Sequence, residues 1–149
     1  MTALAAFVIA LIAVSACTGL HYEVISRLDL ALAARTGSTR RHLPLIITAV
    51  MAAHLIEIAI YAAAFWLVSA KLEVGSFAGG DPVDAAQFFA LAAESYTSFG
   101  YGDIVPTGWL RFIVSLAPIN GLLLLAWSGA FLYGAMQQRA ATTDAGENR

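Results

Sequence analysis

Three long apolar stretches dominate the pattern of hydrophobic and polar positions along the chain: residues 3–20, 44–70 and 110–136. An α-helix rises about 1.5 Å per residue, so roughly 20 apolar residues cross the hydrocarbon core of a bilayer. Each stretch is close to or above this length, and only His54 and Glu57 interrupt the second. The pattern predicts three transmembrane helices.

A shorter helix and an irregular segment are expected between the second and third spans. Asp81 suits the N-cap position and Pro82 the first helical position, so we expect a helix over residues 82–97. At about 15 residues this helix is too short to cross a bilayer, which predicts a re-entrant element. Irregular chain at membrane depth is tolerated only where protein or a water-filled cavity surrounds it.

Composition agrees with a bilayer as the solvent. The 149 residues are 60% hydrophobic and 12% charged, whereas soluble domains are about 45–50% apolar and about 25% charged. We therefore expect an all-α membrane protein surrounded by membrane lipid. The net charge of -2 and the absence of a basic run argue against nucleic acid as a partner.

Basic residues near the predicted spans gather on one side of the membrane. Four arginines lie between the first and second spans and two follow the third, namely Arg27, Arg35, Arg40, Arg41, Arg139 and Arg149. Only Lys71 and Arg111 fall on the other side. The positive-inside rule places the first loop and the carboxy terminus in the cytoplasm. We expect a multi-pass protein of the plasma (inner) membrane, with its amino terminus and re-entrant segment outside.

The single cysteine, Cys17, excludes a disulfide within one chain. Residues 14–17 read Val-Ser-Ala-Cys, which resembles a lipoprotein cleavage box that would leave a lipid on Cys17. The start of the chain lacks the basic residues of a signal peptide. We therefore expect a retained helix in which Cys17 is a small apolar residue.

Gly100 and Gly102 occupy alternate positions in the irregular segment, with Tyr101 between them. Backbone carbonyls can replace the water around a potassium ion if several successive ones point the same way. An ordinary strand alternates them, so positive φ angles are needed in between, and glycine adopts these at little cost. Tyr101 can then point outward and brace the narrow backbone.

Residues 98–103 read Ser-Phe-Gly-Tyr-Gly-Asp, and this stretch resembles the filter of the pore-loop potassium channels, Thr-Val-Gly-Tyr-Gly-Asp. The resemblance covers residues 81–136, with the second span as the outer helix. It implies passive conduction of K⁺, the permeant ion, past the carbonyls of Ser98, Phe99, Gly100 and Tyr101, with the Ser98 hydroxyl as the innermost ligand. It also implies a homotetramer, because one chain supplies a quarter of each ring of oxygens.

Two residues depart from the family's filter. Ser98 replaces threonine and loses a methyl group that restricts the side chain. Phe99 replaces a small β-branched residue, so the packing behind the filter must differ. The coordinating oxygens are unchanged, so we expect selectivity for potassium to survive.

The resemblance divides the chain into three parts. Residues 1–43 form the first transmembrane helix and a basic cytoplasmic loop. Residues 44–136 form the pore domain, with outer helix 44–70, re-entrant pore helix 82–97, selectivity filter 98–103 (including Gly102) and inner helix 109–136. Residues 137–149 form a polar tail that we expect to be disordered.

Three residues are expected to support the filter. Glu94 precedes Asp103 by the spacing that some family members use for a carboxyl pair behind the filter. Such a pair would share a proton or a water molecule, because two close carboxylates resist joint ionisation. The alternative is that Glu94 faces water. The carboxy end of the short helix, near Thr97, carries partial negative charge that favours a cation.

The third span carries residues that could take part in gating. Gly121 lies where the family often has a glycine that bends, and Pro118 can kink the helix. Asn120 is polar within an apolar span, so it faces the pore, water or a neighbouring helix. Gly129 and Gly134 permit close helix contact. The alternative is that all of these are packing residues, which explains Gly129 and Gly134 at least as well.

His54 and Glu57 are three residues apart and share one face of the second span. His21 and Glu23 are expected at the cytoplasmic end of the first span, where they could meet this pair. Three interpretations stay open. The residues form a structural hydrogen-bonded pair, a proton-sensing site that gates the pore, or a metal site of histidine and carboxylate ligands.

The sequence favours a potassium-selective channel over an enzyme, since it shows neither a nucleophile with a nearby base nor a nucleotide-binding loop. Arginines at every third position of an apolar helix, the mark of a voltage sensor, do not occur. The first alternative is a weakly selective or non-conducting pore. The second is a membrane pH or metal sensor that acts through His54 and Glu57.

Overall fold

The computed structural model describes residues 2–34, 42–73, 75–80, 84–100 and 102–147, with the backbone alone for residue 2 and residues 138–147. Four α-helices make up most of the described chain: α1 (Thr2–Ala33), α2 (Leu43–Trp66), α3 (Ala85–Tyr96) and α4 (Gly108–Glu147). A π-helical turn, η2 (Leu67–Lys71), continues α2. Two short strands, β1 (Phe77–Ala78) and β2 (Val105–Pro106), complete the fold.

Three of the helical segments are long and apolar enough to cross a membrane: Ala3–Ala33, Leu43–Lys71 and Gly108–Gln137. In the most apolar 18-residue stretch of each segment, only between 22% and 39% is buried within the chain. The remaining apolar surface is far larger than a protein in water tolerates. The prediction of a helical, multi-pass membrane protein is therefore confirmed.

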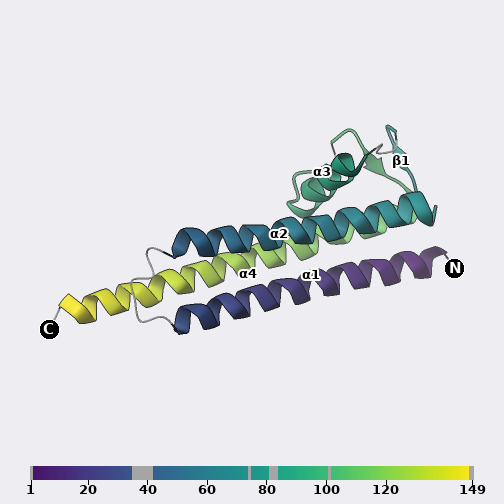
Figure 1. Ribbon diagram of the computed structural model, residues 1–149. Helices are drawn as coiled ribbons and strands as arrows, with labels where there is room; N and C mark the ends of the chain where they lie inside the picture. Colours follow the sequence, from purple (N-terminus) through teal and green to yellow (C-terminus); the bar gives the residue numbers. More distant parts are fainter. Residues whose placement is uncertain (1, 35–41, 74, 81–83, 101, 148–149) are drawn as a thin grey trace.

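The three long helices lie alongside one another, and α1 packs against both α2 and α4 (Figure 1). The amino terminus and α3 lie toward one end of the bundle, and the carboxy terminus lies at the other. Large side chains of α3, among them Phe88, Leu91 and Tyr96, are buried where it packs on α2 and α4. The short helix is thereby fixed to the two long helices that precede and follow it.

Strands β1 and β2 pair antiparallel, with Phe77 opposite Pro106 and Ala78 opposite Val105. The hydroxyl of Thr107 also donates to the backbone oxygen of Ser76 over 2.9 Å. The chain that leaves α2 is thus joined to the chain that enters α4. This pairing closes the excursion that contains α3.

Helix α1 is longer than the apolar pattern predicts, since it continues past residue 20 to Ala33. The added part is rich in leucine, alanine and charged residues, which favour helix without being apolar enough to mark a span. Arg27 and Glu23 form an ion pair over 2.7 Å within this part. His21 consequently lies in the bundle interior, not at the end of a span.

The short helix begins later than predicted. Asp84, not Asp81, is the N-cap of α3, and its carboxylate accepts a hydrogen bond from the backbone N–H of Gln87 over 2.8 Å. Both aspartates suit an N-cap by residue type, and the helix uses the one that has a backbone N–H within reach. Pro82 and Asp81 lie outside the described residues. The helix ends at Tyr96, with Thr97 as the C-cap.

The tail differs from its prediction as well. The backbone of α4 stays helical to Glu147, whereas the sequence analysis expects disorder from residue 137 onward. Alanine, glutamine and arginine dominate the first part of this tail, and these residues have high helix propensity. Polar composition alone predicts disorder, but helix propensity extends α4 beyond the apolar stretch.

Candidate functional site

In the segment after α3, positive backbone φ angles occur at every second residue. Ser98, Gly100 and Gly102 have positive φ angles of 61°, 136° and 56°. The two glycines adopt the conformation that their spacing predicts, and Ser98 adds an unpredicted third position of the same kind. Tyr101 lies outside the described residues. A non-glycine residue at positive φ is uncommon and marks a backbone held by its surroundings.

The end of α3 holds the beginning of this segment. The backbone N–H groups of Phe99 and Gly100 both donate to the carbonyl oxygen of Glu94, over 2.8 and 3.3 Å. The Thr97 hydroxyl donates to the carbonyl oxygen of Ala93 over 2.7 Å. The Phe99 side chain is nevertheless 88% exposed in the single chain. The segment is thus fixed at its base and uncovered on its outer side.

Glu94 lies behind the segment, half-buried, with its side chain directed toward Gly102. A Cβ atom on Gly102 would lie 3.3 Å from Glu94 Oε2. No hydrogen bond joins Glu94 and Asp103, both of which the structure describes. A carboxyl pair that shares a water molecule needs no direct hydrogen bond, so the pair implied by the resemblance stays a prediction.

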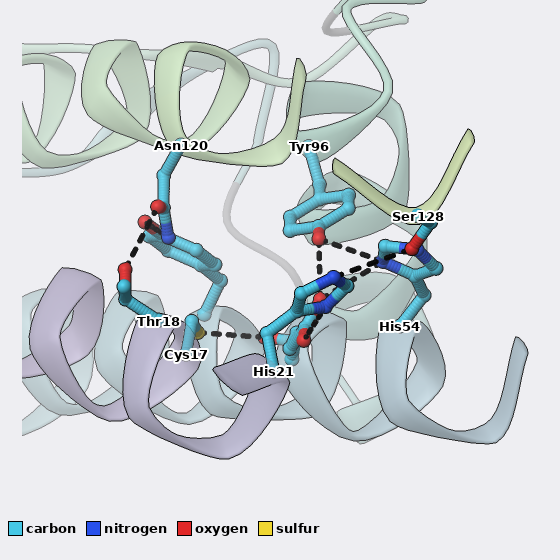
Figure 2. A network of polar contacts seen from close by, with 9 residues as sticks. Cys17, Thr18, His21, His54, Tyr96, Asn120 and Ser128 are labelled. Atoms are coloured by element: carbon cyan, nitrogen blue, oxygen red, sulfur yellow. Dashed lines mark hydrogen bonds and ion pairs between the residues drawn. The ribbon is translucent and has the colours of Figure 1, made fainter. Parts of the chain in front are cut away.

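A second cluster of candidate residues is buried where all four helices meet (Figure 2). His21 comes from α1, His54 and Glu57 from α2, Tyr96 from α3 and Ser128 from α4. His21 and Glu57 are fully buried, and His54 and Ser128 are each 5% exposed. Such residues in an apolar bundle are costly unless they satisfy one another, and here they do.

Glu57 is the centre of the cluster. Its Oε1 lies 2.9 Å from Nδ1 of His21, and its Oε2 lies 2.9 Å from Nδ1 of His54. The Tyr96 hydroxyl donates to Oε2. Burial raises the pKa of the Tyr96 hydroxyl, and the neighbouring Glu57 carboxylate raises it further. Tyr96 therefore keeps its proton and acts as a donor.

The Ser128 hydroxyl contacts the other ring nitrogen, Nε2, of each histidine. Its Oγ lies 2.9 Å from Nε2 of His54 and 3.3 Å from Nε2 of His21. The two imidazole rings lie 5.1 Å apart, centre to centre. Both histidines are thus held between one carboxylate and one hydroxyl.

A second chain of polar contacts runs beside the cluster (Figure 2). The Thr18 hydroxyl donates to Asn120 Oδ1 over 3.3 Å, and Asn120 Nδ2 donates to the Tyr61 hydroxyl over 3.1 Å. Cys17 Sγ donates to the backbone oxygen of Glu57 over 3.6 Å. Of the three surroundings left open for Asn120, it faces neighbouring helices, and it links α4 to α1 and α2.

Tyr96 connects the buried cluster with the exposed segment. Its hydroxyl lies in the cluster, and its backbone precedes Ser98 by two residues. Helix α4 comes very close to this point, because a Cβ atom on Gly121 would overlap the backbone oxygen of Tyr96. Pro118 lies within the same helix, α4. Gly121 therefore has a packing role in this structure.

Most of the predicted cluster is confirmed, with one correction. His21, His54 and Glu57 do meet, but Glu23 does not join them. It lies two residues from His21 on the same helix, so it points elsewhere and pairs with Arg27 at the exposed surface. Tyr96 and Ser128 also belong to the cluster and are not predicted from the sequence. Ser128 could have been found as a polar residue inside an apolar span, by the reasoning applied to Asn120.

The contacts also bear on the three interpretations of His54 and Glu57. Two histidines and a carboxylate are residue types that also bind zinc, and ligand atoms of His21, His54 and Glu57 lie within 4.8 Å of one another. In the structure these atoms contact one another directly at 2.9 Å, a normal hydrogen-bond length. The direct contacts favour the two interpretations without a metal ion, a structural hydrogen-bonded cluster or a proton site, over the metal site.

Comparison of the chain with models of known protein families, with curated proteins and with solved structures finds no match. The two sites are accordingly interpreted from their own residues and geometry.

Proposed function

We propose that the chain is one subunit of a potassium-selective channel, which conducts K⁺ passively through a pore built from four identical chains. The observation that carries this proposal is the alternation of positive φ at Ser98, Gly100 and Gly102, directly after a short capped helix between two long apolar helices. Such alternation is what lets successive carbonyls face the same way. The resemblance of residues 98–103 to a potassium filter indicates potassium as the ion that these carbonyls would bind.

Exposure of the segment supports the assembly. Thr97, Ser98, Phe99 and Gly100 are all exposed in the single chain, and Phe99 is an aromatic side chain with 88% of its surface uncovered. A filter needs carbonyls from four chains around one axis, and the neighbouring chains would also cover Phe99.

Helix α3 supports a cation as the permeant ion. Its carboxy end leads directly into the segment. The carboxy end of an α-helix carries about half a negative charge. The distribution of basic residues supports an orientation with the amino terminus outside and the carboxy terminus in the cytoplasm, and the proposal places the channel in the plasma (inner) membrane.

A flux assay on the protein reconstituted in lipid vesicles tests the proposal. We expect uptake of K⁺ to exceed uptake of Na⁺ strongly, and Gly100→Ala to abolish K⁺ uptake, because alanine is strained at a φ of 136°. Gly19→Ala is the matched control, because a Cβ atom there meets nothing within 4 Å and the residue lies on α1, outside the proposed pore domain.

The outcomes separate the proposal from its alternatives. Equal uptake of K⁺ and Na⁺ would support a weakly selective pore. Absence of uptake of either ion would favour a non-conducting membrane sensor. Unchanged K⁺ uptake in Gly100→Ala would show that residues 98–102 do not form the filter.

A further inference from the structure

His21, His54, Glu57 and Ser128 form a closed circuit of hydrogen bonds, which we call the histidine ring. Each histidine contacts one oxygen of Glu57 through Nδ1 and the shared hydroxyl of Ser128 through Nε2 (Figure 2). Because the circuit is closed, each contact needs one hydrogen, and the hydrogens can be counted.

A carboxylate and two neutral histidines supply one hydrogen too few. An ionised Glu57 only accepts, so Nδ1 of each histidine must carry the hydrogen. A neutral imidazole has a single N–H, so both Nε2 atoms would then be acceptors. Ser128 has one hydroxyl hydrogen and can donate to only one of them. The other Nε2 would face an oxygen with no hydrogen between the two atoms.

One additional proton completes the ring. If one histidine is an imidazolium, its Nε2–H donates to Ser128, and the Ser128 hydroxyl donates to the other Nε2. If the proton is on Glu57 Oε1 instead, this oxygen donates to His21 Nδ1, His21 Nε2–H donates to Ser128, and Ser128 donates to His54 Nε2. Both arrangements contain the same number of protons and satisfy all four contacts.

The lack of positive charge around Glu57 is a second reason for the additional proton. Among the described residues, the other polar or titratable groups beside the ring are Cys17 of α1, Tyr61 of α2, Tyr96 of α3 and Trp127 of α4. None of these groups carries positive charge, so none of them offsets an ionised Glu57. An unpaired charge inside an apolar bundle is strongly unfavourable, whereas a ring with the added proton is neutral overall.

We infer that the histidine ring is a binding site for one proton, beyond those of a carboxylate and two neutral imidazoles, and that Tyr96 couples this proton to residues 98–102. The Tyr96 hydroxyl donates to Glu57 Oε2 and lies 2.9 Å from His54 Nδ1. The proton site stands independently of ion conduction. Its coupling to the filter rests on the proposed function.

Stability measured against pH on the full chain in lipid nanodiscs tests the proton site. Histidines of the unfolded chain lose their protons above about pH 6.5, while the folded ring keeps one. Above this pH the folded state binds more protons, so the folding equilibrium constant falls about tenfold per pH unit until the ring itself loses the proton. Glu57→Gln removes the charge that the proton balances, so the stability of this variant should be independent of pH between about pH 6.5 and pH 8, below the range in which Cys17 of the unfolded chain loses its proton.

A wild-type stability profile that is flat between about pH 6.5 and pH 8, like that of Glu57→Gln, would overturn the proton site. If Glu57→Gln does not fold, the proton site is tested by isotope-edited spectroscopy of the wild type at pH 7.5, which reports the imidazole N–H groups and the ionisation state of Glu57. For His21 and His54 together, we expect either three imidazole N–H groups with an ionised Glu57, or two with a protonated Glu57. Two N–H groups with an ionised Glu57, or a stoichiometric zinc ion retained after purification, would overturn the site.

Tyr96→Phe tests the coupling, because it removes the hydroxyl and leaves the ring intact. We expect K⁺ flux of the wild type to change at the pH where the ring loses its proton, and flux through Tyr96→Phe to be independent of pH while its stability profile remains. If K⁺ flux through Tyr96→Phe depended on pH in the same way as flux through the wild type, the coupling would be overturned, but the proton site would not. Absence of K⁺ flux in the wild type would overturn the coupling and the proposed function together, and the stability arm would still decide the proton site.

Discussion

At the scale of single residues, Gly121 shows how closely α4 approaches the end of α3. A Cβ atom at this position would overlap the backbone oxygen of Tyr96 and lie 2.9 Å from its Cγ. Both atoms belong to a buried residue that cannot move away freely. The glycine is therefore required by packing, whatever it contributes to bending.

We expect Gly121→Ala to lower the free energy of unfolding by about 1–3 kcal/mol, the usual cost of inserting a methyl group into a packed interior. Gly134→Ala is the control, because a Cβ atom there meets nothing within 4 Å and alanine favours helix. Unfolding of both variants in the same lipid environment measures the difference. Equal stability would show that α3 and α4 can separate at no cost.

The buried polar residues were only partly predictable from the sequence. The spacing of His54 and Glu57 puts them on one helix face in any helix, so their meeting follows from local geometry. Ser128 and Tyr96 join them through the packing of α3 and α4 on α2, which no single stretch of sequence encodes. Glu23 was misplaced because the first span was taken to end near residue 20.

At the scale of elements, α3 depends on its cap. Asp84 accepts a hydrogen bond from the backbone of Gln87, and its own side chain is exposed. We expect Asp84→Ala to lower the free energy of unfolding by about 1 kcal/mol, because an N–H at the start of the helix loses its acceptor. Asp84→Asn keeps an acceptor oxygen and should retain most of the stability. If thermal unfolding shows equal losses in the two variants, the negative charge and not the hydrogen bond stabilises the helix start.

The existence of the elements was easier to predict than their ends. Apolar length alone identified all three long helices, because a bilayer imposes the same requirement on each. Hydropathy reports transfer into lipid, and a helix can continue beyond the lipid on propensity alone. This is why α1 reaches Ala33 and α4 reaches Glu147, both past their predicted ends.

At the scale of the whole molecule, the proposal requires four chains. One chain has a mass of 15.7 kDa, and we expect native mass spectrometry in detergent to find a particle of four times this mass. Phe99→Ser should weaken this assembly, because it removes an exposed aromatic side chain that the neighbouring chains would cover. Leu4→Ser, at another exposed apolar position, is the control. A wild-type particle with the mass of one or two chains would contradict the proposed pore.

Each chain supplies every member of the histidine ring from its own helices. An assembly of four chains would thus carry four equivalent acid-responsive units around a single conduction path. Equivalent units that act on one shared element can respond cooperatively, with a Hill coefficient as high as their number. Titration of such a channel could therefore be considerably steeper than that of an isolated imidazole, and subunits carrying Glu57→Gln would reduce the steepness in proportion to their share of the mixture.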